Sequence, residues 1–180
     1  MKAPILSTNQ KTMRRRFWLT LMASGAALGA VGCGFALRKA PNFAFKTLFS
    51  PLGETSPVGV ELKRSLESGG NVRVINDVRQ IDQAEVILEV LGERREKVVV
   101  SRNAVGQVRE FQLRMNFSFR LRSAKGKDLI ANAELVQQRD ISFNESAVLA
   151  KEAEEGLLYR EMQSDIVQQI MRRLAAVTAL

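Results

Sequence analysis

A strict alternation of apolar and polar side chains along residues 110–122 constrains the fold more than any other feature of the sequence. The apolar positions are Phe111, Leu113, Met115, Phe117, Phe119 and Leu121. The positions between them are polar or charged: Glu110, Gln112, Arg114, Asn116, Ser118, Arg120 and Arg122. A period of two residues is typical of a β-strand with one buried and one hydrated face. The pattern therefore predicts an antiparallel sheet with one wet face.

The remaining strands are expected at residues 42–50, 72–75, 85–101 and 129–138. Gly92 lies in the middle of one of them and predicts a bulge. Residues 103–106 form a hairpin connection and residues 125–128 form a turn, so consecutive strands there are antiparallel. A further polar turn is expected at residues 77–83.

Two segments have the spacing of amphipathic helices. The first covers residues 58–68, and Gly69 and Gly70 are expected to end it. A helix of about thirty residues follows Ser142 or Asn144, either of which can cap it. Its apolar positions are Leu149, Ala153, Leu157, Met162, Ile166, Ile170 and Leu174. Gly156 leaves open whether this helix is continuous. The predicted fold class is α+β, with two helices packed on one face of a mostly antiparallel four-stranded sheet, in a single domain over residues 42–180.

The first 32 residues have the pattern of an export signal. Five basic residues and no acidic residue precede an uncharged run over residues 17–31. This run is shorter than the roughly 20 residues of a spanning helix. Gly32 and Cys33 resemble the end of a bacterial lipoprotein signal, which implies cleavage before Cys33 and acylation of that residue. Residues 1–32 are thus the predicted signal peptide, and residues 33–41 a lipidated tether.

The start residue and the export route stay open, whereas the residue after Cys33 favours one of the two membranes. Either Met1 or Met13 can serve as the start, and the arginines at 14–16 are compatible with more than one export route. Gly34 follows the cysteine where an aspartate would resemble an inner-membrane retention signal, so the outer membrane is favoured.

The formal net charge of +8 alone would suggest a nucleic-acid or acidic-surface partner. Removing the five basic residues before Cys33 leaves 22 basic residues against the 19 acidic ones. The predicted mature chain is therefore nearly balanced, and nucleic acid is a poor partner for an exported lipoprotein.

The residue inventory argues against an enzyme. The chain has no histidine and one cysteine, which excludes His-dependent catalytic triads, His-ligated metals and an internal disulfide. Glu152, Glu154 and Glu155 fit a solvated helix face better than an acid–base pair. No phosphate-binding loop or dinucleotide fingerprint is present. We expect no catalytic residue, no metal and no cofactor other than the covalent lipid on Cys33.

Basic residues on the central strands are the candidate binding site. The candidates for an anionic lipid or glycolipid are Arg94, Arg95, Arg114, Arg120, Arg122 and Lys127. If these strands pair as hairpins, several of these side chains share the face away from the helices, and arginine suits bidentate contacts with phosphates. Charged residues also protect sheet edges and keep a surface soluble, and the sequence alone favours that second interpretation.

Four segments resemble the LptE (RlpB) family of lipopolysaccharide-assembly lipoproteins of Gram-negative outer membranes. They are the opening Cys33–Arg38, the first expected strand Phe43–Ser50, the residues Arg139–Asn144 before the last helix, and the helix itself from Glu154 to Leu174. The resemblance implies a sandwich of two helices and a four-stranded sheet that sits as a plug inside the LptD β-barrel. It also implies roles in assembly of that barrel and in lipopolysaccharide binding. The alternative is a lipid-binding auxiliary lipoprotein of another envelope transport system, acting without a barrel.

Overall fold

A computed structural model describes residues 41–53 and 56–180. The predicted signal peptide, Cys33 and all but the last residue of the predicted tether lie outside the described residues. The chain from Ala40 onward forms one compact unit.

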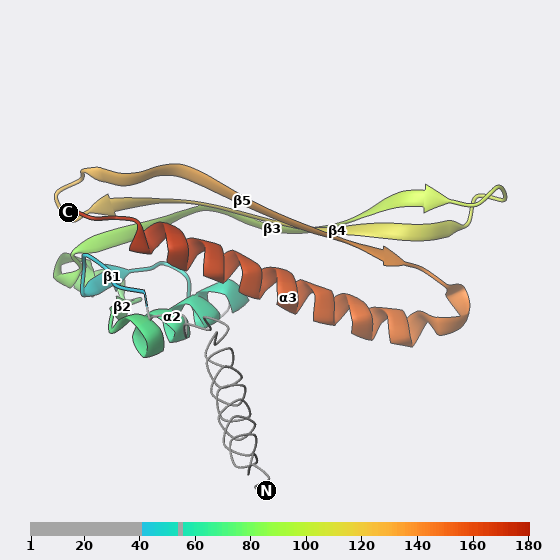
Figure 1. Ribbon diagram of the computed structural model, residues 1–180, viewed down its shortest axis with the longest axis horizontal. Coiled ribbons are helices and arrows are strands. Elements are labelled where there is room, and N and C mark those ends of the chain that lie inside the picture. Colours follow the sequence, from blue (N-terminus) through green and yellow to red (C-terminus); the bar gives the residue numbers. More distant parts are fainter. Residues whose placement is uncertain (1–40, 54–55) are drawn as a thin grey trace, which may run out of the picture. The chain divides into compact units, whose positions relative to one another are not determined.

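A five-stranded sheet forms one layer of this unit (Figure 1). Its strands are β1 (Thr47–Phe49), β2 (Arg73–Ile75), β3 (Val86–Arg102), β4 (Val108–Ser123) and β5 (Asp128–Ser142), in the order β2-β1-β3-β4-β5. The pairs β3–β4 and β4–β5 are antiparallel, whereas β1 is parallel to both β2 and β3. The predicted α+β class with a mostly antiparallel sheet is therefore confirmed.

The sheet has five strands rather than the four of the predicted fold class, because two short strands extend it at one end. β1 covers only part of the strand expected at residues 42–50, since Leu48 and Phe49 alone find partners on β3. Its other neighbour, β2, is only three residues long. The residues before Thr47, where the alternation begins at Phe43, lie outside the sheet, and the chain bends at Ala44 and Lys46.

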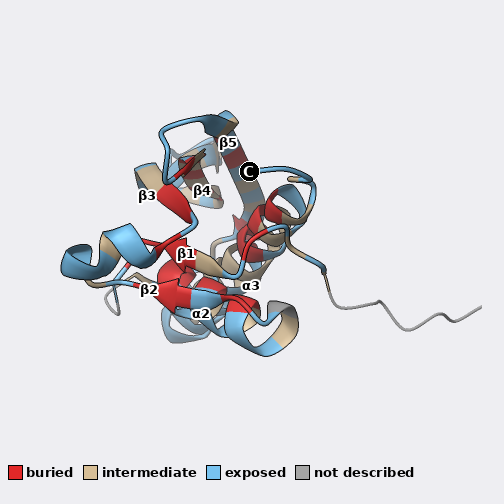
Figure 2. Ribbon diagram, turned by 90° about the vertical axis from the view of Figure 1, so that its left-hand side faces the viewer, coloured by how far each residue is buried: buried red, intermediate tan, exposed pale blue. Residues whose placement is uncertain are grey.

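Both long helices lie on the same face of the sheet, as predicted (Figures 1 and 2). The helix α2 (Pro57–Gly70) begins at Ser56, whose hydroxyl accepts a hydrogen bond from the Gly59 N–H at 3.1 Å. Gly69 and Gly70 were expected to end this helix, but they lie inside its last turn. Asn71 ends it instead, because its backbone is left-handed, with φ of 51°.

The helix α3 (Val148–Ala175) runs through Gly156 without a break. It follows a short 3₁₀ turn, η3 (Glu145–Ala147), where the Asn144 side chain accepts a hydrogen bond from the Ser146 N–H. α3 itself begins after Ala147 without a side-chain cap, so the prediction that Ser142 or Asn144 caps it is wrong. At 1.5 Å per residue its 28 residues extend over about 42 Å. The turn expected at residues 77–83 is a second 3₁₀ segment, η2 (Val78–Gln83).

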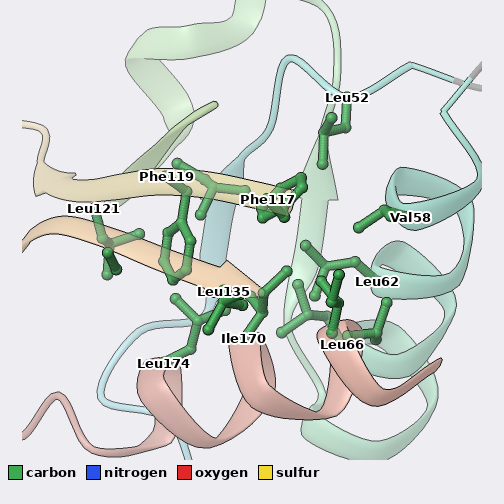
Figure 3. Close-up of a cluster of buried hydrophobic side chains, with 14 of the residues drawn as sticks. Leu52, Val58, Leu62, Leu66, Phe117, Phe119, Leu121, Leu135, Ile170 and Leu174 are labelled. Carbon is green, nitrogen blue, oxygen red and sulfur yellow. The ribbon is translucent and has the colours of Figure 1, made fainter. Parts of the chain in front are cut away.

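The apolar face of β4 and the two helices form the core (Figure 3). Phe117, Phe119 and Leu121 are fully buried against α2 and α3. The helices contribute the buried side chains Leu62, Leu66, Met162, Ile166, Ile170 and Leu174. α2 approaches the preceding loop closely at Gly59, where an added Cβ would lie 2.6 Å from the Leu52 Cβ.

The predicted bulge at Gly92 is confirmed, and it reverses which side chains of β3 face the helices. Before the bulge Val90 pairs with Phe119, and after it Glu93 pairs with Phe117. Paired residues of antiparallel strands point to the same face, and one extra residue inverts the alternation. Arg95 and Lys97 therefore lie on the helix side, opposite Met115 and Leu113.

The first turns of α3 differ from the prediction. Leu149, Ala153 and Leu157 were expected in the core but are exposed, with Leu149 82% and Leu157 54% accessible to solvent. α2 begins beside Gln163, whose side-chain amide donates to the Pro57 carbonyl at 3.2 Å. The N-terminal part of α3 thus extends past α2, which leaves this stripe uncovered (Figure 1).

Candidate functional site

The face of β3, β4 and β5 turned away from α2 and α3, here called the open face, carries four of the six predicted basic residues. Arg114, Arg120 and Arg122 lie on it because they alternate with the buried residues of β4. Arg94 joins them because it pairs with Asn116. The structure thus brings these four arginines onto one surface, as the sequence pattern predicted.

Glu89 holds two of these arginines in fixed positions. The Nε atoms of Arg120 and Arg122 donate to the two carboxylate oxygens of Glu89. Hydrogen bonds from Arg122, which has the larger effect, and from Arg120 lower the pKa of the Glu89 carboxyl below its ordinary value of 4.5. Two guanidinium groups share one carboxylate, so this cluster keeps one net positive charge for an anionic ligand.

The lowered pKa of Glu89 predicts a pH-dependent contribution to stability. A carboxyl whose pKa is lower in the folded state stabilises the fold above its ordinary pKa, and the contribution is lost as pH falls through the lowered pKa. Glu89→Gln should therefore destabilise the protein at pH 7, by about 1 kcal/mol or less because the pairs are partly exposed. The deficit relative to wild type should shrink well below pH 4.5.

Urea denaturation of both proteins at pH 7 and pH 3 measures this difference. The control is Glu67→Gln, which changes an exposed residue of α2 outside the cluster. If Glu89→Gln lowers the free energy of unfolding equally at both pH values, the ion pairs of Glu89 with Arg120 and Arg122 do not stabilise the fold as described.

Arg94 and Arg114 occupy the middle of the open face, beside Glu96, which is the register partner of Arg114 on β3. The Arg94 Nε lies 3.0 Å from the Glu96 carboxylate, and its side chain is mostly exposed. The Arg114 Nε donates to the Gln112 side chain at 2.7 Å. In the part of the chain that the structure describes, no carboxylate forms a salt bridge with Arg114. Its guanidinium is therefore the one on this face best placed to bind an external anion.

Arg95 does not join this surface, although it was one of the six candidates. Its guanidinium lies over the Tyr159 ring, 5.4 Å from the centroid, and donates to Gln163 of α3 at 3.3 Å. The reversed alternation after Gly92 explains this placement. Arg95 thus contributes to packing between the sheet and α3.

Lys127, the last candidate, lies in the turn between β4 and β5. Its backbone N–H donates to the Ser123 hydroxyl at 3.2 Å. Arg139 is a further basic residue of β5 on the helix side, where it pairs with Asp165 at 2.7 Å. The basic residues are therefore divided between both faces of the sheet, rather than concentrated on one.

Two glutamates of α3 form ion pairs with lysines. Glu155 pairs with Lys97 at 2.6 Å, and Glu154 pairs with Lys151 at 2.8 Å. Within residues 41–53 and 56–180, no group of three or more potential metal ligands comes together. Among the same residues, no helix has both the length and the apolar character needed to cross a membrane.

A helix-covered sheet with an arginine-bearing open face defines a two-layer α+β domain of the binding or scaffolding class. The sequence model of the family LptE, described as lipopolysaccharide-assembly, matches residues 45–174. The chain belongs to this family, which confirms the resemblance found in the sequence. The family is non-enzymatic, and this confirms that the protein is not an enzyme.

Individual relatives extend the match over nearly the whole chain. The LPS-assembly lipoproteins LptE of Yersinia pestis (strain Pestoides F) and Yersinia pseudotuberculosis (serotype O:1b) are 29% identical over 170 residues, which cover 93% of this chain and 79% of each relative. The solution NMR structure of uncharacterized lipoprotein B from Nitrosomonas europaea is 32% identical, with a TM-score of 0.67 over 79% of this chain and 91% of that chain. The crystal structure of rare lipoprotein B from Shewanella oneidensis has the same fold, with a TM-score of 0.58, 20% identity, and coverage of 72% of this chain and 94% of that chain.

Proposed function

We propose that this protein is a lipid-anchored subunit of the outer-membrane lipopolysaccharide translocon. The observation that carries the proposal is the match of residues 45–174 to the lipopolysaccharide-assembly family. In this role the mature chain is held at the outer membrane by acyl chains on Cys33, and the domain supports assembly of an LptD-like β-barrel and acts as its plug. The domain also binds lipopolysaccharide during its insertion into the membrane.

Lipopolysaccharide binding is supported by the chemistry of the open face. Lipopolysaccharide combines phosphate groups with sugar hydroxyls, and both are hydrogen-bonding groups. Arg114 and the Arg120–Glu89–Arg122 cluster provide guanidinium donors for phosphates. Asn116 and Gln138 flank Arg114 on the neighbouring positions of the same face and offer amide groups to sugars.

A protein partner is supported by the exposed apolar side chains at the end of the domain where α3 begins. Leu149 and Leu157 are exposed on α3, and Val105 is 79% exposed at the tip of the β3–β4 hairpin. Exposed apolar patches are typical of contact sites, and these three side chains lie on elements at the same end of the domain (Figure 1). The inner wall of a barrel that encloses this end of the domain would cover them.

Charge reversal tests the assignment of the open face. Arg114→Glu combined with Arg120→Glu should weaken lipopolysaccharide binding at least tenfold, because each charged hydrogen bond contributes about 1.5–3 kcal/mol. The fold should persist because both side chains are at least partly exposed. Fluorescence titration with labelled lipopolysaccharide at fixed salt measures the affinity, and circular dichroism checks the fold.

The matched control reverses two arginines on the helix layer. Arg64→Glu with Arg160→Glu changes the net charge equally, but on residues of α2 and α3 far from the open face. Binding should be retained in this control. Equal loss in both double variants would assign binding to overall charge, and unchanged binding in Arg114→Glu/Arg120→Glu would assign the open-face arginines to solubility.

A further inference from the structure

A pocket at the beginning of α3 has no role in the function proposed above. It has a volume of about 230 Å³ and lies on the helix side of the sheet, between β3, β4, the end of β5 and the first turns of α3. Its apolar wall consists of Phe111, Ile141, Phe143 and Val148. The rings of Phe111 and Phe143 meet edge to face, with centroids 5.3 Å apart. The pocket therefore has an apolar surface against which an apolar ligand group can pack.

The bulge at Gly92 explains why the protein leaves this space open. After the bulge β3 directs Lys97 to the helix side, while Val98 pairs with Gln112 on the open face. The Lys97 ammonium lies 2.6 Å from the Glu155 carboxylate and 4.4 Å from the centroid of the Phe111 ring. At the level of Leu113 the helix side of β3 therefore carries the charged Lys97, while the aliphatic side chain of Val98 points away. Apolar groups that border an open space lack packing partners on that side.

The charged rim of the pocket contains one readily available cation. The Lys151 ammonium lies 2.9 Å from the Ser142 hydroxyl and 2.8 Å from Glu154, whose side chain is 48% exposed. Exposed ion pairs contribute little stability, so a ligand anion can replace Glu154 at small cost. Glu152 also lies on the rim but is exposed, so water and salt screen its charge.

We propose that this pocket binds one acyl chain of an anionic amphiphile. The chain lies along Phe111, Phe143 and Val148, and the carboxylate or phosphate of the head group binds Lys151 and Ser142. The volume equals that of about eight water molecules at roughly 30 Å³ each, which gives room for about eight methylene groups. Both a free fatty acid and an acylated phosphorylated glycolipid provide such a chain. Only the identification of the ligand as a glycolipid depends on the function proposed above.

Photocrosslinking tests the pocket in the full-length protein in its own membranes. The probe is a dodecanoic acid that carries a diazirine on its chain, and labelled residues are mapped after digestion with trypsin. Cleavage after Arg139 and after Lys151 releases one peptide, residues 140–151, that carries much of the pocket wall. We expect the label to concentrate in this peptide, and the corresponding alcohol probe to label it several-fold less because it lacks the charge that Lys151 binds.

Two variants in this peptide separate pocket binding from general labelling of exposed apolar groups. Val148→Phe fills the pocket and should reduce the label at least fivefold. Ala150→Phe adds the same ring to the same peptide at an exposed residue of α3 that does not line the pocket, and it should leave the label unchanged. Equal labelling of wild type and Val148→Phe, or label spread over all exposed apolar peptides, would overturn the proposal.

Competition defines the chain length and the source. Unlabelled carboxylates from hexanoate to octanoate should compete about fourfold better for each added methylene, and the gain should level off near ten carbons when the pocket is full. A gain that continues unchanged to longer chains would contradict the pocket volume. Displacement by lipid A supports the glycolipid source, whereas displacement by decanoate alone supports a single-chain lipid in the same pocket. These results do not depend on a barrel partner, so they can fail separately from the proposed function.

Discussion

Phe117→Asp is expected to abolish cooperative folding of the domain. Phe117 is 0% exposed and lies at the centre of β4, packed against Phe119 at 6.0 Å between ring centroids. Loss of a buried phenylalanine costs about 3–5 kcal/mol. A buried unpaired carboxylate adds a desolvation penalty of several kcal/mol, and the neighbouring strand contributes Glu93 at the paired position. The total reaches the 5–15 kcal/mol that typically stabilises a domain.

The control introduces the same side chain one residue away. Asn116→Asp lies on the open face, where its paired neighbour on β3 is Arg94, so its effect should stay within about 0.5 kcal/mol. Circular dichroism during urea denaturation measures both variants. A cooperative transition in Phe117→Asp would show that the assignment of buried and exposed faces on β4 is wrong.

Cys33→Ser is expected to eliminate lipid attachment completely. Cys33 is the only cysteine of the chain, and serine lacks the thiol to which the lipid would be joined. Each buried methylene of an acyl chain contributes about 0.8 kcal/mol to membrane binding, and two or more chains give stable anchoring. The variant should incorporate no labelled palmitate, retain its signal peptide and be absent from the outer membrane.

Ala36→Ser provides the matched control, because it places a serine three residues further along the tether and leaves Cys33 intact. Palmitate labelling, electrophoretic size and membrane fractionation of the two variants give the comparison. Persistent palmitate labelling of Cys33→Ser would show that the lipid is attached to another residue. Normal signal cleavage in that variant would likewise argue against a lipoprotein signal.

The fold was predictable wherever a single local pattern decides the structure. The alternation on β4 identified its buried face because the same helices cover that strand along most of its length. Gly92 predicted the bulge because it interrupts an apolar strand. The residue types did not show that Arg95 and Lys97 point to the helix side. The exact position of the extra residue in the bulge decides to which face every later residue of β3 points.

The length over which one element covers another was also not predictable from local sequence. Leu149 and Leu157 have the helical spacing of core residues, but whether they are buried depends on where α2 begins relative to α3. Similarly, the length of β1 depends on β2 and β3, which lie more than twenty residues away in the sequence. The shared open-face position was therefore predictable for the arginines of β4, whereas Arg95, which lies beyond the bulge, is on the helix side.

The most direct test of the proposed role is purification of the tagged full-length protein from membranes in mild detergent. The account predicts that a large outer-membrane β-barrel protein co-elutes with it in size-exclusion chromatography at a constant ratio, and mass spectrometry identifies that protein. Elution of this protein alone, as a monomer that retains phospholipid, would contradict the translocon role and favour an auxiliary lipid-binding lipoprotein that acts without a barrel.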